Sequence, residues 1–171
     1  MMSQPLAERL RPKTLDDYIG QKHLVGQGAV LRKMIDAGRV PSFILWGPPG
    51  VGKTTLAQII ANKLDAPFYT LSAISSGVKD VREVIEKAKS NRFFNTVSPI
   101  LFIDEIHRFS KSQQDSLLNA VETGVVTLIG ATTENPSFEV IRPLLSRCQV
   151  YVLKSLDKND LLTLLHKAIA E

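Results

Sequence analysis

The chain has 171 residues, of which 44% are hydrophobic and 22% charged, and its formal net charge is +4. These values are typical of one globular domain and exclude a disordered chain. The mild basic excess permits contact with nucleic acid but does not argue for it, since no block of like charge occurs. The apolar runs are too short to span a membrane. Cys148 is the only cysteine, which excludes an internal disulfide and favours a reducing cytoplasm.

Short apolar runs alternate along the chain with segments of helical periodicity, which predicts an α/β fold with a parallel sheet. We expect strands at Phe43–Trp46, Phe68–Leu71, Ile100–Ile103, Val125–Ile129 and Val150–Leu153. Near-continuous apolar runs are typical of strands that are covered on both faces. The prediction is therefore a parallel five-stranded sheet sandwiched by helices.

Helices are expected between these strands. Apolar residues at helical spacing mark the first two, within 56–64 and 78–88. Ser110 and Gln113 form a capping box that predicts the start of the third. A final amphipathic helix is expected from Asp157 to Glu171. Because nothing follows it, we expect the chain to be a piece of a longer protein.

A phosphate-binding motif directly follows the first expected strand. The residues Gly47, Pro48, Pro49, Gly50, Val51, Gly52, Lys53 and Thr54 match G-x-x-x-x-G-K-[ST] in full. Glycines let backbone N–H groups approach a phosphate chain, and the helix that begins at about Lys53 directs its positive end at the same anion. We expect Lys53 to reach the β- and γ-phosphates, Thr54 to ligate Mg²⁺ and Thr55 to contact the α-phosphate. The sequence therefore predicts binding of ATP with Mg²⁺.

A pair of acids ends the third expected strand. Asp104 and Glu105 would stand at the carboxyl edge of the sheet, where α/β proteins bind ligands. Asp104 is the expected partner of Mg²⁺ through its water shell, and Glu105 is the candidate general base. Taken alone, such a pair fits an ordinary turn equally well. Beside a phosphate loop it predicts hydrolysis, because a nucleotide kinase would not need Glu105.

These motifs together resemble AAA+ ATPases of the clamp-loader clade. The resemblance also rests on the run 130–133 after the fourth expected strand and on Ser146-Arg147-Cys148. Leu10–Gln21 is similar to the N-terminal adenine-side segment of the clade. The stretches 104–115 and 130–139 are similar, more narrowly, to its replication-associated recombination branch. The resemblance covers the chain from about Leu6 to Leu156.

The resemblance implies further site residues. Thr133 falls on sensor 1, which contacts the γ-phosphate; a threonine that caps a turn is the alternative. Arg147 falls on the arginine finger that reaches the nucleotide of a neighbouring subunit; a surface arginine at a helix end is the alternative. The residues that would surround adenine, unless they only pack the N-terminal arm, are Arg11, Pro12, Tyr18 and Ile19.

The resemblance also implies an organisation and partners. It divides the chain into an adenine-side segment (1–24), an ATPase core (25–154) and the first helix of a truncated helical lid (155–171). The sensor-2 arginine and the oligomerisation region of the family would lie beyond it, so we expect this segment alone to bind nucleotide weakly and hydrolyse it negligibly. For the full-length protein, the resemblance implies a homo-oligomer, tetramer or hexamer, that acts on single-stranded or forked DNA at replication forks. It would work in the cytoplasm with the nucleoid, and single-strand binding protein is a candidate partner.

Two alternatives stay open. A branch-migration motor of the RuvB type shares much of the pattern but carries a long hairpin insertion after its acid-pair helix. Here Glu122 is followed within three residues by Val125, which disfavours the motor. A clamp-loader-type subunit that binds nucleotide as a regulatory switch usually lacks one of the site residues that are all present here, namely Lys53, Asp104, Glu105 and Arg147.

Basic residues on and after the second helix are candidates for DNA contact. They are Lys79, Arg82, Lys87, Lys89 and Arg92, in a region that faces the central chamber in clamp loaders. Acids at 80, 83 and 86 are interleaved with them. This pattern favours a solvated face of mixed charge over a DNA surface.

Overall fold

A parallel sheet of five strands lies at the centre of the structure, in the order β2-β3-β4-β1-β5. The structure is a computed structural model that describes residues 4–91 and 97–170. The strands are β1 (Phe43–Trp46), β2 (Phe68–Ser72), β3 (Ile100–Asp104), β4 (Thr127–Thr132) and β5 (Gln149–Val152). All four strand pairings are parallel. The predicted fold class is confirmed.

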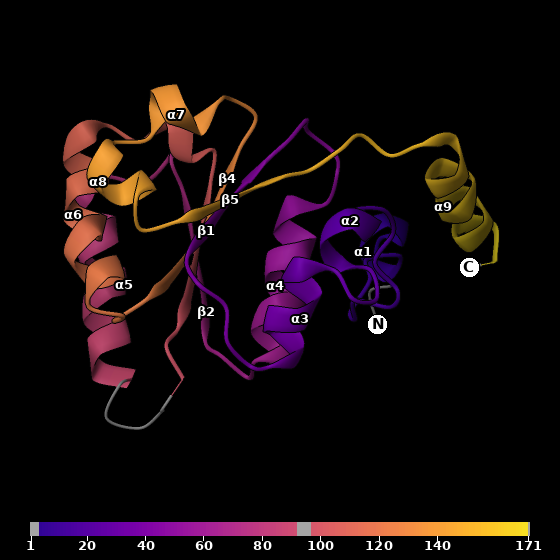
Figure 1. Cartoon of the computed structure of the whole chain (residues 1–171), viewed down its shortest axis with the longest axis horizontal. Coiled ribbons are helices and arrows are strands. Elements are labelled where there is room, and N and C mark those ends of the chain that lie inside the picture. Colours follow the sequence, from indigo (N-terminus) through magenta and orange to yellow (C-terminus); the bar gives the residue numbers. More distant parts are fainter. Residues whose placement is uncertain (1–3, 92–96, 171) are drawn as a thin grey trace.

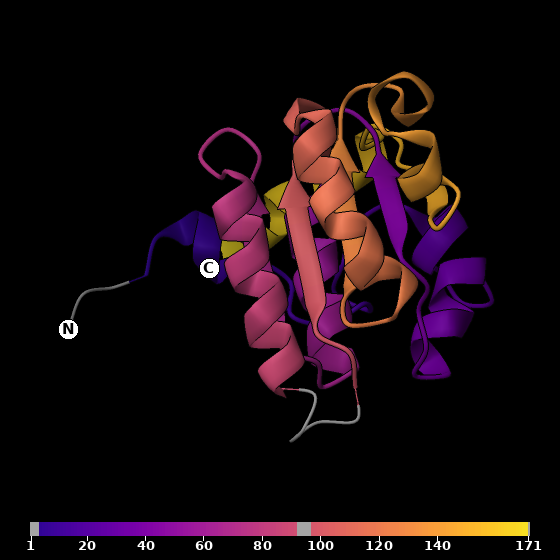
Figure 2. The ribbon, with the colours of Figure 1, turned by 90° about the vertical axis from the view of Figure 1, so that its left-hand side faces the viewer.

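Helices cover both faces of the sheet (Figure 1). One face carries α5 (Val78–Asn91) and α6 (Lys111–Glu122), which lie side by side in front of the strands in Figure 2. The other face carries α3 (Val30–Asp36) and α4 (Lys53–Lys63). Phe43 and Leu45 join the core under α4, whereas Ile44 joins the core under α5 and α6. This alternation explains the continuous apolar runs, because successive strand residues point to opposite faces and both faces are buried.

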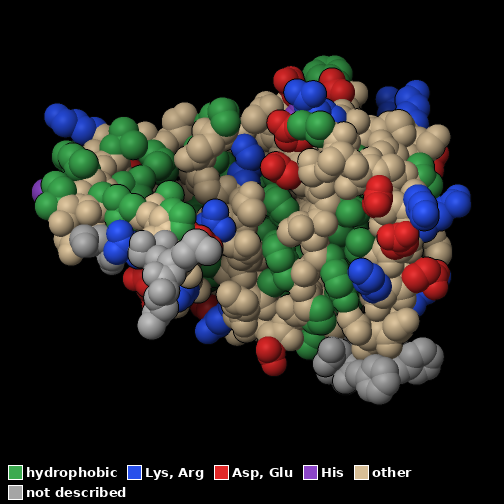
Figure 3. Space-filling model, turned by 180° about the vertical axis from the view of Figure 1, so that it is seen from behind, with side chains coloured by type: hydrophobic (Ala, Val, Ile, Leu, Met, Phe, Trp, Pro, Cys, Tyr) green, Lys and Arg blue, Asp and Glu red, His purple; other side chains and the backbone are tan. Residues whose placement is uncertain are grey.

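The final helix, α9 (Lys158–Ala170), lies beside the N-terminal segment, which contains α1 (Leu6–Arg9) and α2 (Lys22–Val25) (Figure 1). The Lys167 ammonium donates a hydrogen bond to the carbonyl oxygen of Asp17 at 3.1 Å. The predicted terminal helix is therefore present over 158–170, while Glu171 lies outside the described residues. The exposed apolar side chains of α9 are Leu161, Leu162, Leu165 and Ile169. Hydrophobic side chains gather on the lobe at the left of Figure 3, which is the end of the molecule where α9 lies. Within residues 4–91 and 97–170, no helix has the length and apolar character needed to cross a bilayer.

The predicted bounds of the fourth strand were wrong. Val125 and Val126 are buried in the turn that precedes β4, and the strand itself runs from Thr127 to Thr132. The run 130–132 therefore belongs to the strand and does not follow it. Gly130 fits there because a Cβ atom at this position would lie only 3.1 Å from Cδ1 of Ile106. The predicted bounds of β1 are confirmed, β2 and β3 each extend one residue further than predicted, and β5 begins and ends one residue earlier.

The connections around α6 agree with the sequence. Ser110 caps the helix, since its hydroxyl accepts from the Gln113 amide and the Gln113 side chain accepts from the Ser110 amide. The helix ends at Glu122 and β4 begins at Thr127, so the predicted lack of an insertion here is confirmed.

Of the basic residues predicted as candidates for DNA contact, Arg92 lies outside the described residues and the other four lie on α5. The ammonium of Lys89 is 3.4 Å from the carboxylate of Glu86, one of the interleaved acids.

Candidate nucleotide-binding site

A cleft of about 680 Å³ opens at the carboxyl edge of the sheet. We call it the polar cleft. Residues from the phosphate loop, the acid pair, the end of β4 and the N-terminal segment line it: Ala7, Arg11, Pro49, Gly50, Gly52, Lys53, Thr54, Thr55, Asp104, Glu105, Thr132 and Thr133. Parallel strands end at the same edge of a sheet, so segments far apart in the sequence meet here.

The phosphate loop joins β1 to α4. Gly50 and Gly52 adopt positive φ angles of 79° and 89°, which glycine accepts without strain. The Lys53 ammonium donates hydrogen bonds to the carbonyl oxygens of Gly47 at 2.7 Å and Pro48 at 2.9 Å. Burial lowers the pKa of Lys53, and the charge of Asp104 opposes that shift. Lys53 is thus held against the backbone of the loop, close enough to Asp104 for the two charges to interact.

The acid pair leaves β3 in a tight turn. Asp104 is the last residue of the strand, and Glu105 has a φ of 53°, in the left-handed region. A short 3₁₀ helix, η1 (Ile106–Arg108), follows and brings Nε of Arg108 to 3.2 Å from the Glu105 carboxylate. Arg108 is a contact of the candidate base that sequence reasoning missed. Its i,i+3 spacing to Glu105 was the available signal.

Two oxygen donors of the polar cleft suit Mg²⁺. Thr54 at the start of α4 and Asp104 at the end of β3 both line it, and Mg²⁺ prefers hard oxygen ligands. The described residues contain no group of three or more His, Cys, Asp or Glu that could hold a metal by itself. A donor set this small fits Mg²⁺, which usually keeps several waters and takes further oxygens from nucleotide phosphates.

The two threonines at the end of β4 have different environments. Thr133 is exposed and lines the polar cleft, as its predicted contact with the γ-phosphate requires. Thr132 is only 1% exposed, and its hydroxyl contacts His107 and the backbone of Glu134. This contact of Thr132 with His107 was not predicted, because 25 residues separate the partners.

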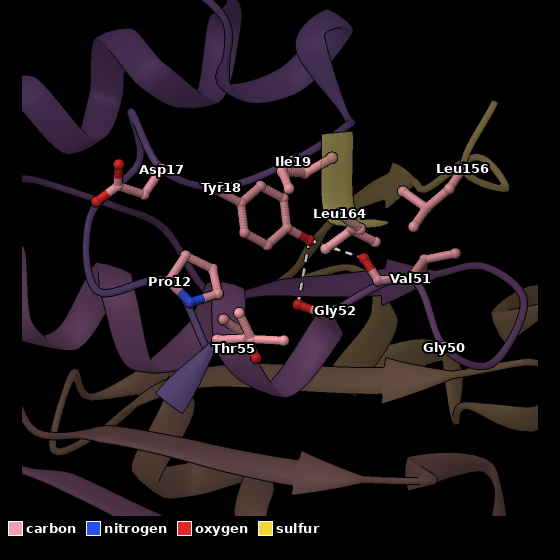
Figure 4. A pocket seen from close by; sticks show the side chains of 11 residues that line it. Pro12, Asp17, Tyr18, Ile19, Gly50, Val51, Gly52, Thr55, Leu156 and Leu164 are labelled. Carbon is pink, nitrogen blue, oxygen red and sulfur yellow. Dashed lines mark hydrogen bonds between the residues drawn. The ribbon is translucent and has the colours of Figure 1, made fainter. Parts of the chain in front are cut away.

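A smaller pocket of about 130 Å³ adjoins the polar cleft and shares Gly50, Gly52 and Thr55 with it. Its other lining residues are Leu10, Pro12, Asp17, Tyr18, Ile19, Val51, Leu156 and Leu164, most of them apolar (Figure 4). We call it the apolar pocket. It contains three of the predicted adenine residues, whereas the fourth, Arg11, lines the polar cleft instead. Leu164 comes from α9, so the terminal helix forms part of the wall.

Tyr18 supports the phosphate loop from this side. Its hydroxyl lies 2.9 Å from the carbonyl oxygen of Val51 and 3.1 Å from that of Gly52 (Figure 4). Burial raises the pKa of the Tyr18 phenol, so this group stays a neutral donor. A Cβ atom on Gly52 would lie 2.9 Å from the same hydroxyl, which is a second reason for glycine at this position.

Arg147, within the described range 97–170, does not line the polar cleft of its own chain. It follows α8 (Arg142–Leu145), is 56% exposed, and lies 3.4 Å from the carboxylate of Glu122 at the end of α6.

The remaining short helix, α7 (Pro136–Glu139), is held by the buried side chain of Gln114, which donates to the carbonyl oxygen of Glu139 at 3.1 Å.

The phosphate loop connects a central parallel strand to a helix, and the acid pair lies at the end of β3 on the same edge of the sheet. This combination defines a P-loop nucleoside triphosphatase fold. The chain belongs to the AAA family, the ATPase family associated with various cellular activities, which matches residues 43–156.

Comparison with curated relatives shows which members of this family the chain is similar to. The chain is 53% identical over 167 residues to replication-associated recombination protein A of Haemophilus influenzae, covering 98% of this chain and 37% of that protein. It is 52% identical over 165 residues to ATPase WRNIP1 of Dictyostelium discoideum, covering 96% of this chain and 19% of the relative. The predicted resemblance to the replication-associated recombination branch is confirmed. The chain thus spans well under half the length of these relatives.

Among solved structures, the RuvB Holliday junction branch migration motor of Thermotoga maritima superimposes with a TM-score of 0.76. The two sequences are 32% identical, and the match covers 94% of this chain and 54% of the other. The core of the motor and this chain therefore share one architecture, although the sequence reasoning disfavoured a motor of this type.

Proposed function

We propose that this chain binds MgATP and hydrolyses it as the ATPase core of an oligomeric protein that acts on DNA at replication forks. The observation that carries the hydrolytic part is the composition of the polar cleft. Lys53, Thr54, Asp104, Glu105 and Thr133 come from three segments of the chain and line one cavity. Each is a residue type that phosphoryl transfer to water requires.

The geometry supports a division of work within the site. Backbone N–H groups of the phosphate loop and the amino end of α4 face the phosphate chain, and the apolar pocket beside them takes the base. The Lys53 ammonium exchanges the carbonyl oxygens of Gly47 and Pro48 for phosphate oxygens when nucleotide enters. The loop therefore keeps the lysine hydrogen-bonded before its ligand arrives.

Glu105 and Thr133 serve the attacking water. The Glu105 carboxylate accepts a proton from the water and orients it, while the Thr133 hydroxyl contacts the γ-phosphate. Thr54 and Asp104 would hold Mg²⁺, which when bound neutralises charge on the phosphates. We assign the apolar pocket, with Pro12, Tyr18 and Ile19, to adenine, and Arg11 to the phosphate or ribose side.

Assembly completes the site in this proposal. Arg147 lies away from the polar cleft of its own chain and is largely exposed, as a residue must be if it serves a neighbour. We propose a tetramer or hexamer in which Arg147 reaches the γ-phosphate bound by the adjacent subunit. Segments 1–24, 25–154 and 155–171 would be the adenine-side segment, the core and the first lid helix.

The DNA-directed role is supported by the names of the relatives, which refer to replication-associated recombination and to a Holliday junction motor. Single-stranded or forked DNA is the proposed substrate, and single-strand binding protein is a proposed partner. Affinity for a forked DNA should fall steeply with salt concentration, because phosphate contacts release counterions. An affinity that does not change with salt would contradict direct contact with the DNA backbone.

The hydrolytic role is tested in the full-length protein with Glu105→Gln, which removes the base but keeps the shape of the side chain. We expect ATP binding to persist and turnover to fall at least about a hundredfold. Glu139→Gln, an exposed change on α7, is the matched control and should leave both unchanged. Turnover that survives Glu105→Gln would remove Glu105 from its role, and binding without turnover in the unaltered protein would favour a regulatory nucleotide switch.

A further inference from the structure

The hydroxyl of Thr132 lies at the centre of a buried polar contact between two walls of the polar cleft. Its Oγ1 atom is 2.9 Å from Nδ1 of His107, 2.9 Å from the amide nitrogen of Glu134 and 3.2 Å from the carbonyl oxygen of Glu134. Thr132 ends β4, whereas His107 lies in η1, directly after the acid pair. The contact therefore joins the loop of the candidate base to the loop of Thr133.

Proton counting assigns the donor in this contact. A threonine hydroxyl has one hydrogen to donate and two lone pairs that accept. One lone pair accepts the Glu134 amide, which can only donate. All three contacts are satisfied together only if the hydroxyl donates to the Glu134 carbonyl and its second lone pair accepts Nδ1–H of His107. That arrangement requires a proton on Nδ1 of the imidazole.

The contact is paired with an apolar one on the neighbouring residue. Ile106 is fully buried, and its side chain packs on β4 where Gly130 leaves room for it. Ile106 and His107 thus attach η1 to β4 at two successive points, one apolar and one polar. Packing at Ile106 has no preferred direction, whereas the hydrogen bond at His107 is directional and opposes a tilt of η1 against β4.

The restraint acts on two residues of the proposed chemistry. Glu105 immediately precedes η1, and Thr133 immediately follows Thr132. His107 is not among the residues that line the polar cleft or the apolar pocket in the described part of the chain. It can therefore affect a bound nucleotide only through the groups that it holds.

We propose that His107 is a positioning residue for ATP hydrolysis, which donates Nδ1–H to Thr132 and so sets the placement of Glu105 relative to Thr133. The inference rests on the proposed hydrolytic function. Misplacement of a catalytic group by about 1 Å can reduce a rate about a hundredfold, so loss of this hydrogen bond should lower kcat. Nucleotide affinity should stay the same, because the phosphate loop and the apolar pocket do not depend on His107.

Two pairs of variants of the purified full-length protein test the proposal. His107→Asn places an amide N–H near the position of Nδ1–H, whereas His107→Leu keeps a similar volume without a donor. Thr132→Ser keeps the hydroxyl, and Thr132→Val removes it at nearly constant shape. We expect His107→Leu and Thr132→Val to lower kcat about tenfold or more with an unchanged Kd for ATP, and the Asn and Ser variants to retain most of the activity. The double variant should lose no more than Thr132→Val alone, because that change already removes the contact with His107 together with the two contacts with Glu134.

Glu105→Gln, measured beside them, separates this inference from the proposed function. If the unaltered protein turns over ATP and Glu105→Gln does not, the function stands and the Leu and Val variants decide the role of His107. If His107→Leu does not fold, the Thr132 pair tests the hydroxyl end of the contact, and the tautomer of the imidazole tests His107 itself. ¹⁵N NMR of the imidazole reports its tautomer without any turnover. Wild-type kcat in both the Leu and Val variants, or a ring protonated only on Nε2, would overturn the proposal.

Discussion

The hydroxyl of Tyr18 lies 2.9 Å from the carbonyl oxygen of Val51, although 33 positions separate the two residues in the sequence. The same hydroxyl is 3.1 Å from the carbonyl oxygen of Gly52. The N-terminal segment thus holds the phosphate loop by its backbone, in the turn that leads into α4. Tyr18, in the wall of the apolar pocket, therefore also supports the phosphate loop.

Tyr18→Phe should weaken ATP binding, because it removes this hydrogen bond while the ring still fills the apolar pocket. One hydrogen bond contributes about 1 kcal/mol, so the loss of affinity should be up to about fivefold. Titration calorimetry with ATP measures it. Tyr151→Phe is the matched control, since the Tyr151 hydroxyl makes only a 3.8 Å contact with the sulfur of Met34. Equal affinities for the two variants would contradict a supporting role for Tyr18.

Gly47→Ala should destabilise the fold. A Cβ atom at Gly47 would lie 2.8 Å from both Cβ and the carbonyl oxygen of Leu153, so the end of β5 would have to move away from β1. Overpacking of this kind costs about 1–3 kcal/mol. Gly77→Ala is the control, because the nearest atom to its added Cβ is 3.8 Å away. Thermal melts compare the two, and similar melting temperatures would show that Leu153 yields easily.

In the full-length protein, Arg147→Ala should abolish most turnover and leave ATP binding intact if the residue serves a neighbouring subunit. An arginine finger contributes about a thousandfold or more to hydrolysis. Mixing Arg147→Ala protein with inactive Glu105→Gln protein should restore part of the activity, since the second variant supplies the finger and the first supplies an intact site. Arg142→Ala, an exposed change on α8, should behave like the unaltered protein. A mixture that stays inactive would argue against action between subunits.

The Cys148 thiol should react slowly with alkylating reagents in the folded protein. Burial raises its pKa from 9.0 to about 12, so at pH 8 the reactive thiolate is about a thousandfold rarer than in the unfolded chain. The fold favours the neutral thiol. The stability that this preference contributes is therefore fully present below pH 9.0 and is lost as the pH rises toward 12. Iodoacetamide labelling at pH 8 with and without denaturant measures the difference, and equal rates would contradict burial of the thiol.

Local pattern was enough to predict most of the fold and the chemical centre of the site. The phosphate loop, the acid pair and the Ser110 capping box are contiguous motifs, and each lies where its spacing indicated. The bounds of β4 were missed because Val125 and Val126, although apolar, are buried in the turn before the strand. The hydrophobicity of single residues does not distinguish a buried turn from a strand.

The contacts that shape the site could not be predicted in the same way. Leu164 in the apolar pocket and the bond between His107 and Thr132 depend on how distant segments pack. No spacing rule connects residues that meet only after the sheet has formed. The residues whose roles depend on a partner, Arg147 above all, stay predictions.

The side chain of Gln21 links the N-terminal segment to the stretch between β5 and α9. Gln21 is buried with a φ of 57°, and its amide both donates to the carbonyl oxygen of Lys154 at 2.7 Å and accepts from the Lys154 amide at 2.9 Å. These two hydrogen bonds resemble a backbone pair between neighbouring strands, with the amide group of the Gln21 side chain in place of a peptide group. The linker between β5 and α9 is thereby fixed near its start, at Lys154. A movement of α9 relative to the apolar pocket would therefore have to pivot in the few residues between Lys154 and Lys158, the first residue of the helix.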